Sequence, residues 1–207
     1  GKSTFFNKIS GASARVGNWP GITVDLSSIK TLINGEMTEL IDLPGIYNLN
    51  GYSEDEEVVI NFIDNNKIDQ VFFIMNSTQI DRQLPLAISI QKLGIPVIIL
   101  ANMIDEAKAL GITFDFEQMT KLLGCPVLPI SAKYGQGREK INNTLNAPKK
   151  IKTDLQAIDE QLLSQNIFDK TVNMPLLLND KKTKLLDSIF PVSYTHLRAH
   201  ETLMNLV

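Results

Sequence analysis

The sequence predicts an α/β fold in which a mostly parallel, six-stranded sheet is covered by helices on both faces and followed by a small all-α appendage. Two observations lead to this prediction. Apolar runs of strand length alternate with helical patterns, and the runs are Val71–Met75, Val97–Leu100 and Val127–Ile130. After Pro148 this alternation gives way to leucines at helical spacing. Ligands bind such sheets at the carboxyl ends of the strands, so we expect the functional site there.

The first part of the chain predicts a helix, a loop and a hairpin. Residues Ser3–Ser10 continue as a helix, and small residues, glycine and proline make Ala12–Gly21 a loop. Asn34-Gly35 favours a hairpin turn between two strands, which we place at Ser27–Ile33 and Met37–Ile41.

Helices are expected to alternate with the buried strands that follow. After a loop at Asp42–Gly51, Ser53 and Glu56 form a capping box that starts a helix. Its apolar stripe consists of Val58, Val59, Phe62 and Ile63. Later helices are predicted at Arg82–Leu93, Phe116–Leu123 and Gly137–Leu145.

These patterns divide the chain into three segments. Residues 1–147 are predicted to form the α/β domain, and residues 148–190 part of a helical domain that begins with the basic linker Lys149–Lys152. Residues 191–207 include SYTHLRAHET, which looks like translated sequencing-adapter read-through, and we exclude them from functional reasoning. We therefore do not interpret the i, i+4 pair His196 and His200 in this tail as a metal site.

The composition excludes several classes of protein. Of 207 residues, 43% are hydrophobic and 21% charged, as in globular rather than disordered proteins. A formal net charge of −3 gives no bulk electrostatic reason to bind nucleic acid. The longest apolar run, Pro96–Ala101, is far below the roughly 20 residues of a membrane helix, so we expect the chain as given to be soluble. The single cysteine, Cys125, is interpreted as a small buried hydrophobe.

The chain opens on Gly1-Lys2-Ser3-Thr4, which matches the end of the phosphate-binding pattern GxxxxGK[ST]. In that loop, backbone N–H groups and a helix N-terminus hold phosphates, the lysine reaches the β- and γ-phosphates, and the next hydroxyl binds Mg²⁺. Four residues alone fit a capped helix start equally well. Because the chain starts without methionine inside this motif, we expect it to be a fragment.

Three further motifs each follow a predicted strand. Asp42-Leu43-Pro44-Gly45 has the DxxG pattern, whose aspartate holds Mg²⁺ through water and whose glycine lets a backbone N–H approach the γ-phosphate. In Asn102-Met103-Ile104-Asp105, the last carboxylate can accept both N1–H and the 2-amino group of guanine, a donor pair that adenine lacks. In Ser131-Ala132-Lys133, the Ala132 N–H is expected to face guanine O6. Thr23 is placed as a switch threonine that binds Mg²⁺ and senses the γ-phosphate.

Each of these signals has a plainer explanation when taken singly, such as a turn at a strand end or, for Thr23, a residue with β propensity. Their shared order and spacing are too regular to be accidental. Together they predict a Ras-like P-loop GTPase fold. Met103 stands where the general base-reading pattern NKxD has lysine, and its long apolar side chain can still pack near the base, so guanine selection should survive.

The loop Arg15–Val24, with its stretch NWPGITV, is more specific than the general GTPase motifs. Together with DLPGIY from Asp42 and NMIDEA from Asn102, it resembles the cytosolic G domain of bacterial ferrous iron transport protein B, from Gly1 to about Leu145. In that family, a small helical domain that modulates nucleotide affinity follows, and then a polytopic membrane domain. The resemblance implies a GTP-hydrolysing switch at the cytoplasmic face of the bacterial inner membrane. Its partner would be the transporter's own membrane domain, which takes up Fe²⁺ and could bring the chain into an oligomer.

The resemblance also assigns roles to individual residues. Lys2, Thr23 and Gly45 would be catalytic, and Ser3, Thr23 and Asp42 would bind Mg²⁺. A K⁺ ion would lie near Asn18 and Trp19. The residues expected to bind GTP or GDP are Gly1, Lys2, Ser3, Thr4, Gly21, Ile22, Thr23, Asp42, Leu43, Pro44, Gly45, Asn102, Met103, Asp105, Ser131, Ala132 and Lys133.

Ile46 stands where Ras-like enzymes place a glutamine that orients the attacking water. An aliphatic side chain cannot do this, so hydrolysis should be slow or should rely on backbone groups and a monovalent cation. Relatives use K⁺ held near switch I and by a P-loop asparagine, which would lie upstream of Gly1. The fragment is therefore expected to bind GTP poorly.

Two alternatives stay open. A soluble GTPase that binds ribosomal RNA during assembly would share the four motifs, although the net charge, the lack of a basic appendage and NWPGITV argue against it. A non-hydrolysing binding module would share the four motifs without turnover.

The acidic run Glu54–Glu57 could suggest an iron site, but acidic residues are favoured at a helix N-terminus by the helix dipole, and we interpret the run in that way.

Overall fold

The computed structural model describes residues 2–10, 15–17, 19, 22, 25–33, 35–145 and 158–175. In chain order, the first elements are α1 (Lys2–Ser10), β1 (Arg15–Gly17), β2 (Leu26–Ile33), β3 (Glu36–Asp42), α2 (Glu54–Asn65), β4 (Val71–Asn76), α3 (Ile80–Lys92) and β5 (Val97–Asn102). They are followed by α4 (Ile104–Ala109), β6 (Thr113–Phe114), α5 (Phe116–Leu123), β7 (Val127–Pro129), α6 (Arg138–Leu145), α7 (Glu160–Thr171) and β8 (Val172–Asn173).

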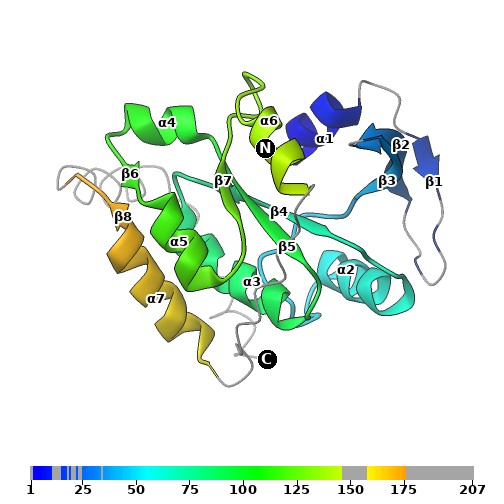
Figure 1. Ribbon diagram of the computed structural model, residues 1–207. Helices are drawn as coiled ribbons and strands as arrows, with labels where there is room; N and C mark the ends of the chain where they lie inside the picture. The colour runs from blue at the N-terminus through cyan, green and yellow to red at the C-terminus, as the bar shows by residue number, and fades with distance from the viewer. Residues whose placement is uncertain are drawn as a thin grey trace, which may run out of the picture.

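A parallel sheet of β4, β5 and β7, with β5 in the middle, lies at the centre of the molecule (Figure 1). Every residue of β5 is buried, as expected for a parallel strand covered on both faces. Because side chains alternate along a strand, Ile99 and Ala101 pack with α3, α5 and α7, whereas Ile98 and Leu100 pack with α1 and α6. The α/β prediction with a covered parallel sheet is confirmed.

The strands β1, β2 and β3 form a separate antiparallel group. The predicted hairpin is present, with Leu32 opposite Met37 and Gly35 in the turn at φ 84°. β1 was not predicted, because its three residues lie in the stretch expected to be a loop. The predicted sheet has six strands and is mostly parallel. In the described part of the chain, β1 to β5 and β7 are divided between two sheets of three strands, one parallel and one antiparallel, because β3 is not hydrogen-bonded to β4.

Helix α7 is the described part of the predicted helical appendage, and it packs directly on the α/β core. Ile167 is fully buried among residues of α3 and α5. At the start of α7, Glu160 accepts a hydrogen bond of 2.6 Å from the Ser89 hydroxyl and forms a 3.1 Å ion pair with Lys92. At its end, β8 pairs antiparallel with β6. The rest of the predicted helical segment, including the basic linker, and the tail with both histidines lie outside the described residues.

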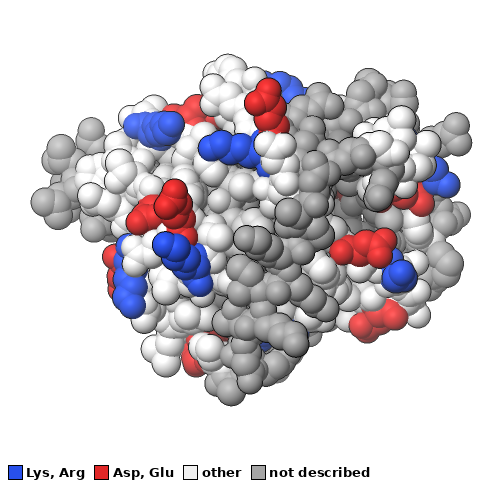
Figure 2. All heavy atoms as spheres, viewed as in Figure 1, with Lys and Arg blue, Asp and Glu red and all other residues white. Residues whose placement is uncertain are grey.

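Surface charge on the described part is mixed. Figure 2 shows basic and acidic side chains interspersed over the face drawn there. Within the described ranges, none of the helices combines the length and apolarity needed to cross a bilayer.

The single cysteine, Cys125, is buried as predicted, and its burial raises the pKa of the thiol to about 12.

Candidate functional site

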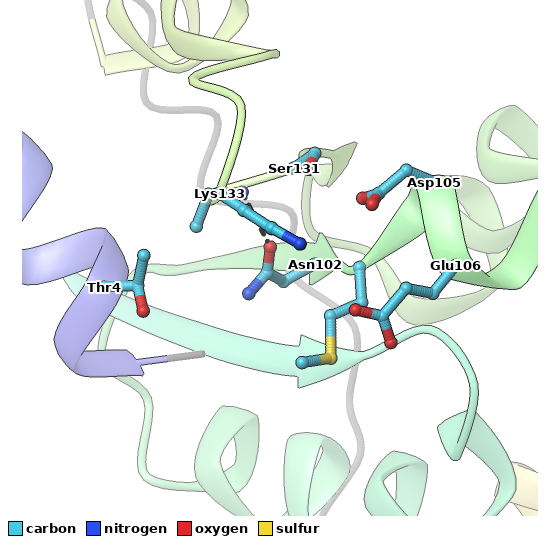
Figure 3. Close-up of a pocket in the computed structure, with 8 residues that line it drawn as sticks. Thr4, Asn102, Asp105, Glu106, Ser131 and Lys133 are labelled. Carbon is cyan, nitrogen blue, oxygen red and sulfur yellow. Dashed lines mark hydrogen bonds between the residues drawn. The ribbon is translucent and has the colours of Figure 1, made fainter.

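A pocket of about 150 Å³ lies at the carboxyl ends of β5 and β7. Figure 3 shows Asp105 and Glu106 entering it from the first turn of α4, with Thr4 of α1 on the opposite side. The lining residues are Thr4, Asn102, Met103, Asp105, Glu106, Ser131, Ala132 and Lys133. All except Glu106 are predicted nucleotide-binding residues, and they come from three of the four predicted motifs: those that begin at Gly1, Asn102 and Ser131. The motif Asp42–Gly45 does not line this pocket. Glu106 was missed, although it directly follows Asp105 in the same motif.

Asn102 joins the two motifs at the sheet edge. Its side chain is buried, and Oδ1 accepts a 2.9 Å hydrogen bond from the Ala132 N–H. That N–H was expected to face guanine O6, and in this structure it is donated to Asn102 instead. A contact with O6 would thus need this hydrogen bond to be shared or exchanged.

The Ser131 hydroxyl is a buried polar group at the pocket wall. Ser131 is 1% exposed, and within the described part of the chain its oxygen has no hydrogen-bond partner. Buried polar groups are rarely left unpaired, because each one costs about 1–3 kcal/mol. The Ser131 hydroxyl is therefore a candidate hydrogen-bond partner for a ligand in the pocket.

Met103 takes an unusual backbone conformation at the junction of β5 and α4. Its φ of 62° makes it the one non-glycine residue with positive φ in the part of the chain that the structure describes. Such a residue is strained, and strain of this kind gathers at functional sites. The turn lets Met103 accept from the Ala107 N–H, which starts α4 and puts Asp105 in its first turn.

The loop after β7, residues 131–137, is closed by short-range backbone hydrogen bonds. Ser131 and Gln136 exchange two of these, each 3.2 Å long, and the Tyr134 N–H donates to the Ser131 carbonyl at 3.1 Å. Gly137 ends the loop at φ 92°, where an added Cβ would lie 2.7 Å from Ile130 Cγ2.

Lys2 connects the start of α1 with the DxxG turn. Its ammonium forms a 2.8 Å ion pair with Asp42 and also donates to the Leu43 carbonyl. The contact holds the Asp42 carboxylate against the first residue of α1, which Ser3 follows in sequence, and hydroxyl and carboxylate oxygens are the donors that Mg²⁺ prefers. Pro44 and Gly45 continue the turn, and open space surrounds the position of a Cβ on Gly45.

Several predicted residues cannot be placed. Gly1, Asn18, Gly21 and Thr23 lie outside the described residues, so the switch threonine and part of the proposed K⁺ site have no structural account. Of their neighbours, Trp19 packs on Phe62 at 5.4 Å between ring centroids, and its carbonyl accepts from the Ile22 N–H at 3.1 Å.

The acidic run forms the first turn of α2, as the helix-dipole interpretation predicts. The Ser53 hydroxyl accepts the Glu56 N–H at 3.2 Å, and the Glu56 carboxylate accepts the Tyr52 N–H at 3.0 Å. One half of the predicted capping box, the Ser53 cap, is therefore confirmed, while the Glu56 carboxylate accepts from the backbone of Tyr52 rather than of Ser53.

Comparison with known proteins agrees with this arrangement. The family model for ferrous iron transport protein B matches residues 1–145. An Fe(2+) transporter FeoB from Synechocystis sp. is 42% identical over 185 residues, which cover 89% of this chain and 29% of that protein. The cytosolic domain of L. pneumophila FeoB superposes with a TM-score of 0.66 at 34% identity, covering 72% of this chain and 61% of the other. A GDP-bound mutant of S. thermophilus NFeoB gives 0.67 at 32% identity, covering 75% and 60%. The chain thus spans less than a third of the Synechocystis relative.

Proposed function

This chain belongs to the ferrous iron transport protein B family, and we propose that it is the GTP-binding and GTP-hydrolysing switch domain of a bacterial Fe²⁺ transporter. The main support is the pocket that gathers Thr4, Asn102, Asp105 and Ser131 at one edge of the parallel sheet. A relative at 32% identity is bound to GDP, which supports guanine nucleotide as the ligand.

Guanine recognition would centre on Asp105. Its carboxylate, at the pocket wall, can accept N1–H and the 2-amino group together, and adenine offers no such pair. The unpaired Ser131 hydroxyl gives the ligand a further polar partner, and Met103 and Lys133 line the pocket beside the base.

The phosphates would bind at the N-terminus of α1. Lys2 would leave Asp42 and stabilise negative charge on the β- and γ-phosphates, together with backbone N–H groups at Gly1 and Gly45. Ser3, Thr23 and Asp42 would hold Mg²⁺, which supplies positive charge to the phosphate oxygens when bound. Gly21 and Ile22 would flank the switch threonine.

Hydrolysis is proposed to be slow without a monovalent cation. The aliphatic side chain of Ile46 packs against the core that contains α3 and has no polar group with which to orient an attacking water. A K⁺ ion near Asn18 and Trp19 would take over part of the charge stabilisation.

We propose residues 1–147 as the G domain, residues 148–190 as part of a helical regulatory domain and residues 191–207 as an unrelated tail. By analogy with the cytosolic domain of the L. pneumophila relative, the chain would lie at the cytoplasmic face of the membrane and act on a membrane domain of its own transporter, with no nucleic-acid partner. Docking of α7 on α3 and α5 supports a regulatory segment in contact with the G domain.

Asp105→Asn tests the base site in the protein encoded by the complete reading frame. The substitution replaces one acceptor oxygen of the carboxylate by an NH₂ donor. Affinity for GDP should therefore fall about 10- to 100-fold, as for loss of a hydrogen bond to a charged group, while affinity for xanthosine diphosphate should rise. Asp115→Asn, at the N-cap of α5, is the matched control. Unchanged GDP affinity in Asp105→Asn would show that the base binds elsewhere.

The same protein tests turnover and transport. Phosphate release from GTP should require Mg²⁺ and be faster in K⁺ than in Na⁺, and no turnover under any condition would favour a binding module. A complete reading frame without hydrophobic spans after the helical region would exclude the transporter and favour a soluble GTPase.

A further inference from the structure

Helix α1 has one face directed at the 131–137 loop. Thr4 lines the pocket, and Phe5 is buried in the cluster that contains Ala132, with its ring 6.0 Å from that of Phe72. Lys8 follows Thr4 at i+4, so both side chains lie on the same side of the helix. The helix that starts at the proposed phosphate site therefore also supports the proposed base site.

Lys8 contacts the loop directly. Its ammonium donates a 2.6 Å hydrogen bond to the Lys133 carbonyl, and it lies 3.9 Å from the position of a Cβ on Gly135. The backbone hydrogen bonds within the loop connect Ser131 with Tyr134 and Gln136. The Lys8 contact acts at a different point, the carbonyl that follows Ala132, and holds it against α1.

We propose that Lys8 is a positioning residue for guanine recognition. By holding the Lys133 carbonyl, it keeps the backbone of Ala132 and Lys133 at the pocket wall and slows release of the nucleotide. The inference rests on the proposed function of the pocket. Since both partners are exposed, water competes with the contact, and its loss should accelerate loop opening about 2- to 10-fold.

Three variants test the proposal in the full-length protein. Lys8→Met keeps the length of the side chain and removes its donors, whereas Lys8→Arg restores a cationic donor. Lys121→Met, at an exposed position on α5, is the matched control. Amide exchange is measured at Ser131, Tyr134 and Gln136 without added nucleotide, and the dissociation rate of a fluorescent GDP analogue is measured by stopped flow.

Lys8→Met should speed exchange at the three loop amides and release of the GDP analogue, while Lys8→Arg and Lys121→Met should behave like the unmodified protein. Affinity for inorganic pyrophosphate, which has no base, should not change. Unchanged loop exchange in Lys8→Met, failure of arginine to rescue, or an equal loss of pyrophosphate affinity would each overturn the proposal. If the unmodified protein binds no GDP, the proposed function fails, and loop exchange alone decides whether Lys8 holds the loop.

Discussion

Substitution of Gly137 by alanine separates two consequences of adding one methyl group at the end of the 131–137 loop. A residue at φ 92° is strained whatever its surroundings, by about 1–2 kcal/mol for a side chain in the left-handed region. In addition, the new Cβ would lie 2.7 Å from Ile130 Cγ2 and 2.8 Å from the Pro129 carbonyl oxygen. Overpacking of this kind adds about 1–3 kcal/mol. Gly137→Ala should therefore lower the free energy of unfolding by about 2–5 kcal/mol.

Gly94→Ala is the matched control, because Gly94 has a similar φ of 72° and no atom within 4 Å of the Cβ position. It should lose only the backbone part, about 1–2 kcal/mol. Urea denaturation at 25 °C measures both free energies, with unchanged m-values as evidence for two-state unfolding. Equal losses in the two variants would refute tight closure of the loop on Pro129 and Ile130. Because a backbone oxygen cannot yield easily, Gly137→Ala should also release GDP faster, and Gly94→Ala should not.

Two further perturbations address other parts of the molecule. Asp42→Asn removes the ion pair with Lys2, which then no longer competes with phosphate for the Lys2 ammonium. GDP affinity measured by calorimetry without Mg²⁺ should rise, and the increase in affinity on adding Mg²⁺ should shrink. Weaker GDP binding without Mg²⁺ would contradict competition between Asp42 and phosphate for Lys2. Ile167→Ala should cost about 2–5 kcal/mol of unfolding free energy because Ile167 is fully buried between α7 and the core, whereas Leu162→Ala, at 73% exposure, should stay within about 0.5 kcal/mol. Similarly small losses in both would argue against docking of α7 on the core.

The parallel strands β4, β5 and β7 and most residues of the pocket at their carboxyl ends could be predicted because their signals are local and strong. A continuous apolar run is long enough to identify β5, and it was placed at Val97–Leu100 against the observed Val97–Asn102. The carboxyl ends of neighbouring parallel strands share an edge, so residues after β5 and β7 had to lie close together. Side-chain chemistry then marked Asn102, Asp105 and Ser131 at that edge.

The elements and contacts that were missed depend on distant parts of the chain. β6 and β8 have two residues each and exist through pairing with each other, across about sixty residues of sequence. No periodicity can mark a strand so short. Lys8 is one of several exposed lysines in the sequence, and only the packing of α1 on the 131–137 loop distinguishes it. The positive φ of Met103 was equally hidden, since that conformation is typical of glycine and asparagine.

The hydrogen bond between Asn102 and Ala132 suggests how the pocket can select guanine. The Ala132 N–H is buried, so losing its acceptor would cost about 1–3 kcal/mol. Guanine O6 is an acceptor and could share or replace Asn102 Oδ1, which keeps the N–H paired throughout binding. Adenine carries an amino group at the same position and offers only donors there, so it would meet the N–H with a like partner. Selectivity in this view has two sources on the same edge of guanine: Asp105 would accept from N1–H and the 2-amino group, and the Ala132 N–H of the 131–137 loop would donate to O6. Loosening the loop through Lys8 or Gly137 should then weaken discrimination against adenine nucleotides, while Asp105 continues to read N1–H and the 2-amino group.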